Sequence, residues 1–258
     1  MNTHTKPIPD WLLALGRRPL PSSIEVAGHC FDLVKPFKHD FFAATALYGG
    51  PAGKVVLKIG RCTSLLGLPL TWLGRRMMRH EARLYGLAQG IPGIPAFVGF
   101  VGPTGFAHEY VEGRQLARDD QPPDEFFPAL SHLLDALHER QIAYVDLEKP
   151  ENILLGDDGR PHLIDFQISW HASDRWIGRT WPARRLLKVL QGSDRYHLLK
   201  HWRKLRPDQL TGDVLAESMR IPFWIRWHRA VFRPITLCRR QVLVWMGVRS
   251  SVKVRSPG

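Results

Sequence analysis

A short stretch of the chain, residues 144–167, holds four polar side chains whose types suit chemistry on phosphate groups. Asp146 can orient a hydroxyl group, and Lys149 offers a cation to a phosphate. Asn152 and Asp165 offer oxygen ligands to a divalent metal. Phosphoryl transfer depends on positioning and charge neutralisation more than on covalent chemistry, so this set predicts a phosphotransferase site.

The elements around this stretch predict how the four side chains are presented. Two short apolar runs, 153–155 and 162–164, flank a Gly-Asp-Asp-Gly-Arg turn and predict a β-hairpin. Asp165 then follows the hairpin directly, while Asp146 lies on the loop before it. The alternative is that Asp-x-x-x-Pro-Glu-Asn forms only a turn with a helix cap.

The rest of the chain divides into a strand-rich first part and a helical second part. In the first part we expect a small antiparallel sheet and one helix, with strands at 23–34, 41–48, 54–59, 97–100 and 106–111 and a helix at 70–89.

In the second part, helical spacing predicts a helix at 124–140. Its apolar stripe is Phe127, Leu130, Leu133, Leu134 and Leu137. Residues 174–258 read mostly as helix, with breaks at Pro207, Pro222 and Pro234.

By this order of motifs the chain resembles the protein-kinase-like superfamily. In detail it resembles small bacterial members grouped with lipopolysaccharide-core kinases and RIO-like kinases. The resemblance covers residues 25–170, and residues 195–211 are similar to the C-terminal part of that bacterial group. It implies an α+β, two-lobed fold with a small antiparallel sheet plus helix, then a mainly helical lobe and a basic helical C-terminal extension. The implied units are an N-terminal arm at 1–22, a first lobe at 23–112, a second lobe at 113–215 and a basic, Trp-rich segment at 216–258.

The resemblance also implies ATP and Mg²⁺ as cofactors and a role for each residue of the loop. Asp146 would be the catalytic aspartate, whose carboxylate accepts or orients the proton of the acceptor hydroxyl, and Lys149 would lie near the transferred phosphate. Asn152 and Asp165 would bind the metal, and their interval of 13 residues is the usual one in the family.

Lys58 and Glu81 match the pair that aligns the nucleotide in this family. Lys58 follows the apolar run Val-Val-Leu, and Glu81 lies on the expected helix at 70–89. The alternatives are an ordinary edge-strand lysine at 58, with Lys54 as a weaker competitor for its role, and a surface Glu81 that pairs with Arg79 or Arg83.

The chain departs from the family pattern before and after these residues. Tyr144-Val145 replaces the usual His-Arg, which argues against control by activation-loop phosphorylation. The loop is one residue longer than usual, because Asn152 is six residues after Asp146. Gln167 replaces the glycine after Asp-Phe, which limits backbone freedom there.

No glycine-rich loop stands between the first two expected strands. Lys35, Lys38 or His39 would supply charge to the phosphates instead, and the alternative is a plain basic hairpin. Residues 108–113 resemble the segment that binds adenine. There, main-chain groups of Glu109 and Val111 would contact the base, and His108 would lie at the back of the pocket or be a satisfied buried histidine.

The charge of the chain is concentrated in its last third. Residues 1–174 hold 17 Lys and Arg against 20 Asp and Glu, whereas residues 175–258 hold 19 against 4, with six of the nine tryptophans. This mixture favours an anionic membrane surface as partner. The alternatives are a solvated basic face and nucleic acid, which we consider unlikely because no nucleic-acid motif accompanies the charge.

The expected location follows from segments that the sequence lacks. The N-terminus has no apolar signal-peptide region, and no run of about 18 apolar residues predicts a spanning helix. The three cysteines are far apart and show no metal-ligand spacing. We expect a cytoplasmic kinase, peripheral on the cytosolic face of a membrane, whose acceptor is a lipid-linked sugar or a protein Ser/Thr. The alternative is a pseudokinase that binds a membrane or a partner without turnover.

Overall fold

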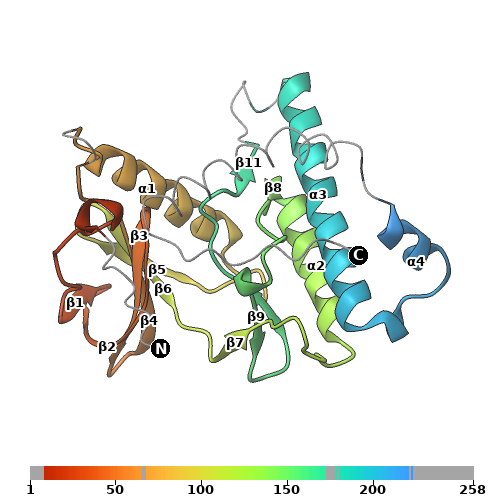
Figure 1. Ribbon diagram of the computed structural model, residues 1–258, viewed down its shortest axis with the longest axis horizontal. Coiled ribbons are helices and arrows are strands. Elements are labelled where there is room, and N and C mark those ends of the chain that lie inside the picture. Colours follow the sequence, from red (N-terminus) through yellow and green to blue (C-terminus); the bar gives the residue numbers. More distant parts are fainter. Residues whose placement is uncertain (1–8, 65–67, 173–177, 179, 221, 223–258) are drawn as a thin grey trace, which may run out of the picture.

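The computed structural model describes residues 9–64, 68–172, 178, 180–220 and 222. These residues form an α+β fold with two lobes side by side, as expected (Figure 1). One lobe is a sheet with a helix lying across it, and the other is dominated by helices. Segments expected at 223–258 lie outside the described residues.

The first lobe is built on a six-stranded sheet in which every neighbouring pair is antiparallel, in the order β1-β2-β3-β4-β6-β5. Helix α1 (Thr71–Ala88) packs against it. The strands are β1 (Ser23–Val26), β2 (His29–His39), β3 (Ala43–Gly50), β4 (Gly53–Gly60), β5 (Phe97–Val101) and β6 (Gly105–Glu109).

The expected single strand at 23–34 is wrong, because the chain reverses at Ala27 and Gly28. Both residues have positive φ, 51° and 78°, as a tight hairpin requires. The second strand then continues to His39, through the stretch predicted to be a connection. Irregular register on both sides of Pro36 explains this, since a proline is tolerated at such interruptions of a ladder.

Close backbone contact fixes how α1 sits against the sheet. A Cβ at Gly74 would lie 2.2 Å from the carbonyl oxygen of Arg61, and one at Gly60 would lie 2.8 Å from the carbonyl oxygen of Gly74. Only glycine permits this approach. The first turns of α1 are thereby held against the end of β4, the strand that carries Lys58.

The second lobe is mainly helical. Helix α2 buries all of the predicted stripe from Phe127 to Leu137, and Trp202 of α3 stacks on Phe127 at 5.5 Å. The elements are β7 (Gly113–Gln115), α2 (Phe126–Glu139), β8 (Ile142–Ala143), β9 (Ile153–Gly156), β10 (Pro161–Leu163), β11 (Trp170–His171), α3 (Trp181–Leu205) and α4 (Gly212–Met219), with 3-10 turns at Asp10–Leu12, Pro150–Asn152 and Pro207–Gln209.

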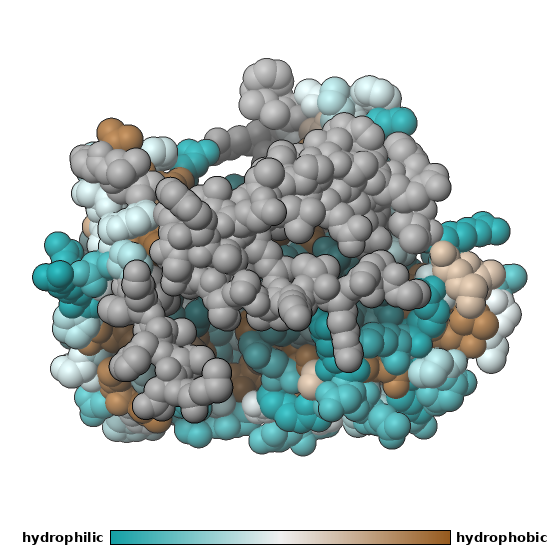
Figure 2. Space-filling model, in the orientation of Figure 1, coloured by the Kyte–Doolittle hydropathy of each residue, from teal (hydrophilic) through white to brown (hydrophobic). Residues whose placement is uncertain are grey.

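Helix α3 ends two residues before Pro207, which confirms the predicted break there. Among the described residues, no helix is both long and apolar enough to cross a bilayer. Hydrophobic surface shows at the right-hand edge of the molecule, over α4, where Val214 and Met219 are exposed (Figure 2).

Candidate active site

Lys58 is held between two carboxylates from different elements. It lies on β4, and its Nζ donates to Glu81 Oε1 on α1 at 2.8 Å and to Asp165 Oδ1 after β10 at 2.8 Å. Lys58 and Glu81 are both buried. Lys54 instead forms a solvent-exposed ion pair with Glu112. Strand β4 lies between β3 and β6 inside the sheet, so the alternatives of an edge-strand lysine at 58 and a surface glutamate at 81 do not describe this structure.

The charges of this group are strongly coupled. Burial opposes the charge of Lys58, but the two carboxylates outweigh it and raise the pKa of the ammonium. Burial also opposes the charge of Asp165, yet Lys58 lowers the pKa of that carboxyl below its usual range. Glu81 is the more deeply enclosed carboxyl, and burial raises its pKa to about 7. Asp165 is thus the carboxylate that stays ionised at neutral pH.

The loop residues Asp146, Lys149 and Asn152 contact one another directly. Asp146 Oδ2 accepts from Lys149 Nζ at 2.6 Å and from Asn152 Nδ2 at 2.9 Å. Burial raises the pKa of Asp146 although both neighbours donate to it. The extra residue of the loop does not move Lys149 away, because its ammonium touches the carboxylate that would orient the acceptor.

A residue that sequence reasoning missed supports this loop from α3. Asp194 is fully buried, and its carboxylate accepts from the backbone N–H of Tyr144 at 2.8 Å and of Val145 at 2.7 Å. His138 Nε2 lies 3.1 Å from the same carboxylate. Val145 has φ +71°, a conformation that β-branched residues rarely adopt, so Asp194 holds a strained backbone just before Asp146.

Further contacts fix the two ends of the loop. Ser169 Oγ donates to the carbonyl oxygen of Tyr144 at 2.7 Å, and His201 Nε2 lies 2.8 Å from that of Leu147. Tyr144 also donates its hydroxyl to the carbonyl oxygen of Ile164. Tyr144 therefore ties the loop to the strand end that presents Asp165.

Aromatic packing sets the position of Asp165. Phe166 is fully buried and lies against Tyr85 and Tyr144, with ring centroids 4.9 and 5.1 Å apart. The Tyr85 hydroxyl accepts from the Asp165 backbone N–H at 3.2 Å. With its neighbour anchored, Asp165 adopts φ +63° and directs its carboxylate to Lys58.

These groups surround a cleft of about 580 Å³ between the lobes. Lys58, Glu81, Asn152 and Asp165 line it together. Asp146 and Lys149 are not among its described lining residues; they join the site through the contact of Asp146 with Asn152.

The three basic residues predicted to replace a glycine-rich loop have different surroundings. Lys38 lines the cleft, where it pairs with Asp40 at 2.8 Å. Lys35 is exposed on β2 and is not among the described lining residues. His39 Nε2 accepts from the Leu15 backbone N–H at 3.0 Å, and burial lowers its pKa, so both observations disfavour His39 as the source of positive charge.

Phe37 is a second residue that sequence reasoning missed. Its ring lines the cleft and stacks on Tyr110, with centroids 6.3 Å apart. An aromatic face at this mouth suits a planar base. Phe37 lies within the basic run that was expected to be a connection between strands. Its place beside the cleft could not be predicted without knowing that β2 extends past Pro36.

The segment expected to bind adenine lines the same cleft. His108 is buried, stacks on Tyr85 at 5.0 Å and donates from Nδ1 to the carbonyl oxygen of Glu109 at 2.7 Å. Burial lowers its pKa to about 4, so the ring is neutral. His108 is thus a satisfied buried histidine at the back of the pocket, and the two interpretations are compatible.

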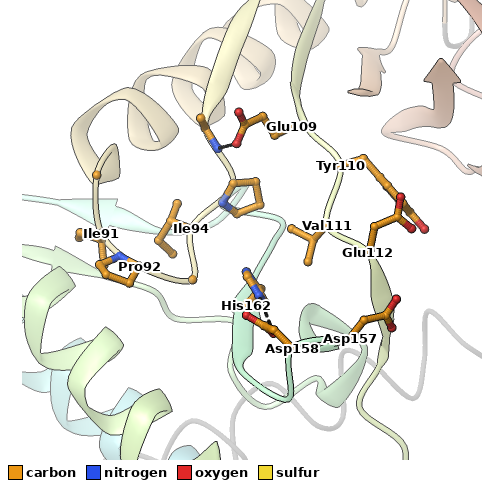
Figure 3. A pocket seen from close by; sticks show the side chains of 14 residues that line it. Ile91, Pro92, Ile94, Glu109, Tyr110, Val111, Glu112, Asp157, Asp158 and His162 are labelled. Carbon is orange, nitrogen blue, oxygen red and sulfur yellow. Dashed lines mark hydrogen bonds and ion pairs between the residues drawn. The ribbon is translucent and has the colours of Figure 1, made fainter. Parts of the chain in front are cut away.

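Glu109 and Val111 are placed differently with respect to this cleft. Val111 lines both this cleft and a second hollow of about 570 Å³, whereas Glu109 lines only the second hollow. Figure 3 shows the Glu109 side chain turned toward the Ala96 backbone nitrogen, which donates to it at 3.4 Å. The Glu109 backbone N–H donates to Ala96 as well. A base could therefore meet only the second lone pair of the Glu109 carbonyl oxygen, which already accepts from His108 Nδ1.

The oxygen donors of the cleft fit a hard divalent cation. Asn152 uses its amide nitrogen on Asp146, which keeps the amide oxygen available, and Asp165 carries two carboxylate oxygens. Mg²⁺ in nucleotide sites commonly takes one or two protein oxygens and completes its shell with phosphate and water. In the part of the chain that the structure describes, no group of three or more His, Cys, Asp and Glu forms a metal-binding cluster.

Comparison with known proteins gives partial likenesses. No family model matches the sequence. The chain is 29% identical over 110 residues to "Serine/threonine-protein kinase C" of Synechocystis sp., across 38% of this chain and 20% of that protein. The Rio2 kinase of Chaetomium thermophilum is similar in structure with a TM-score of 0.48 and 15% identity, over 67% of this chain and 58% of that one. Its complex with ADP, Mg²⁺ and phosphoaspartate gives 0.49 and 14%, over 72% and 61%. The matches thus span a fifth of the curated relative and about three fifths of the solved structures.

Proposed function

We propose that this protein is an ATP- and Mg²⁺-dependent phosphotransferase that moves the γ-phosphate of ATP to a hydroxyl group. One observation carries the proposal: Lys58 bridges Glu81 and Asp165 in the cleft that Asn152 also lines. Burying the Lys58 ammonium between two carboxyl groups costs free energy, because these groups lose contact with water. Such an arrangement is more readily explained by a function than by stability. Binding nucleotide phosphates and a metal ion is such a function.

Each residue has a role in this proposal. Lys58, kept in place by Glu81, binds the nucleotide phosphates, and Lys38 adds charge at the mouth of the cleft. Asn152 and Asp165 would hold Mg²⁺, which would neutralise phosphate charge when bound. Asp146 orients the acceptor hydroxyl, and its raised pKa suits a group that accepts a proton.

The backbone of the segment at 109–111 and the Phe37 ring would hold the base. Lys35 remains a weaker candidate for phosphate binding because it is exposed on β2.

We propose a lipid-linked sugar or a protein Ser/Thr as acceptor. The first follows from the sequence resemblance to lipopolysaccharide-core kinases and from the basic, Trp-rich segment at 216–258, which favours peripheral attachment to an anionic membrane. The second is supported by the partial identity to a bacterial serine/threonine kinase. The competing proposal is a pseudokinase, and the missing glycine-rich loop supports it. The retention of six polar residues that match the kinase pattern opposes it: Lys58, Glu81, Asp146, Lys149, Asn152 and Asp165.

The test is transfer of labelled γ-phosphate from Mg-ATP into a total membrane extract, with the wild type beside Asp146→Asn. Lipid and protein products are separated. We expect label only with the wild type, and the labelled fraction identifies the acceptor class. If neither fraction gains label that depends on Asp146, while the folded protein still binds ATP, the pseudokinase replaces the phosphotransferase.

A further inference from the structure

Helix α1 carries an exposed row of arginines that has no part in the cleft. Arg75, Arg76, Arg79 and Arg83 recur at three- and four-residue spacing, and all four side chains are exposed. The only acidic residue of α1 is Glu81, which is buried against Lys58. Among the described residues, none of the four arginines has an ion-pair partner.

This row is repulsive within the helix. Like charges three or four residues apart on a helix destabilise it by roughly the amount that opposite charges would stabilise it. Negative groups of a partner would attract each arginine and offset the repulsion between them. The charge pattern therefore points to a ligand with many negative groups.

Apolar side chains adjoin the row at the start of α1. Leu68 is 67% and Trp72 is 63% exposed. Trp72 and three of the arginines border a hollow of about 490 Å³. Hydrophobic surface is visible at the upper left of the molecule, beside the start of α1 (Figure 2). A large aliphatic group, an indole and several cations on one face are typical of a surface that enters a lipid headgroup layer.

The arginine row lies beside the cleft, although none of its four arginines lines the cleft. A second hollow of about 450 Å³ has Leu73 and Met77 beside Arg76, Arg79 and Arg83, and Gln167 is part of its lining. Gln167 lines the nucleotide cleft as well. His80 Nε2 lies 3.0 Å from the carbonyl oxygen of Ser169, which holds α1 to the segment after Asp165. A surface bound to α1 would therefore lie next to the mouth of the cleft.

We propose that the exposed face of α1 docks on an anionic phospholipid bilayer. Leu68 and Trp72 enter the headgroup layer, and the four arginines contact lipid phosphates. Docking brings the bilayer to the Gln167 side of the cleft, so an acceptor anchored in lipid reaches Asp146 without leaving the membrane. Docking stands independently, while this placement of the acceptor rests on the proposed phosphotransferase function. Nucleic acid would match the arginines but not the exposed leucine beside them.

The test measures co-sedimentation of the full chain with phosphatidylcholine vesicles, with and without phosphatidylglycerol, in the absence of nucleotide. We expect binding only to the anionic vesicles, decreasing with added salt. Arg75→Glu/Arg79→Glu should lower the partition coefficient by at least about tenfold. Arg75→Lys/Arg79→Lys should restore it, because the charge is kept. The matched control is Arg118→Glu/Arg160→Glu, two exposed arginines near β7 and β10, which should change it little.

The proposal is overturned if Arg75→Glu/Arg79→Glu binds anionic vesicles as well as the wild type does, provided that its thermal unfolding matches the wild type. Binding would then belong to another surface. Absence of binding to anionic vesicles would overturn the proposal too. Binding of a homopolymeric RNA that depends on the α1 arginines, without vesicle binding, would assign the face to nucleic acid. None of these outcomes depends on phosphate transfer, so a failed docking surface and a failed phosphotransferase are told apart.

Discussion

At the scale of single residues, the proposed phosphotransferase site separates nucleotide binding from chemistry. Lys58 and Asp165 line the cleft that we propose binds the nucleotide, whereas Asp146 is contacted by Lys149 and Asn152. Substitution of Asp146 should therefore reduce turnover and leave nucleotide affinity nearly intact.

For Asp146→Asn we expect kcat to fall by about 10²- to 10⁴-fold, the usual range for a lost general base. The dissociation constant of ATP should change by less than about threefold. Steady-state kinetics and calorimetric titration measure the two quantities. Asp213→Asn on α4, an exposed residue, is the control and should match the wild type. Equal losses in turnover and affinity would contradict the role given to Asp146.

Glu81 makes the stability of the protein depend on pH. Its pKa rises from 4.5 to about 7 on folding, so between these values the folded protein holds a proton that the unfolded chain has lost. The free energy of unfolding must then decrease as pH rises through this window. We expect Glu81→Gln to show a smaller decrease than the wild type in urea unfolding across it. Parallel curves for the two proteins would contradict this assignment.

At the scale of elements, α3 acts on the site through Asp194. Asp194→Ala removes the acceptor for two backbone N–H groups, those of the buried Tyr144 and the half-buried Val145. We expect a loss of roughly 2–4 kcal/mol in unfolding free energy, because an unsatisfied buried donor costs about 1–3 kcal/mol. Urea unfolding measures the loss.

The control for Asp194 is Asp135→Ala, which removes a half-exposed partner of Arg195 and should cost less than about 0.5 kcal/mol. In conditions where Asp194→Ala stays folded, its kcat should fall more than its affinity for ATP. A stable variant with full turnover would show that the loop holds its strained conformation without α3.

The sequence predicted the elements whose signals are local. The stripe on α2 and the hairpin before Asp165 have periodic or turn signals within a few residues, and both are confirmed. The β1–β2 hairpin was missed because Ala27-Gly28 is a weak turn signal and Pro36 suggested a break. Asp194 was missed for another reason: it is 48 residues after Asp146, and only tertiary structure shows what an acid inside a helix contacts.

At the scale of the whole molecule, every residue that we assign to the candidate site lies before residue 221. Residues 221–258 hold eight Lys and Arg and no Asp or Glu. A chain ending at residue 220 should therefore bind ATP with a dissociation constant within about threefold of the full chain. Titration of both proteins measures this. A folded truncated chain that no longer binds ATP would show that the last segment takes part in the cleft.

The contact between Lys58 and Asp165 joins residues 107 positions apart, one from each lobe. This ion pair therefore links the two lobes across the cleft. If the protein binds ATP as proposed, we expect the ion pair to break transiently when ATP enters, so that the association rate levels off at high ATP concentration. A weaker ion pair should then speed both the association and the dissociation of ATP, and the residence time of ATP should change more than its affinity.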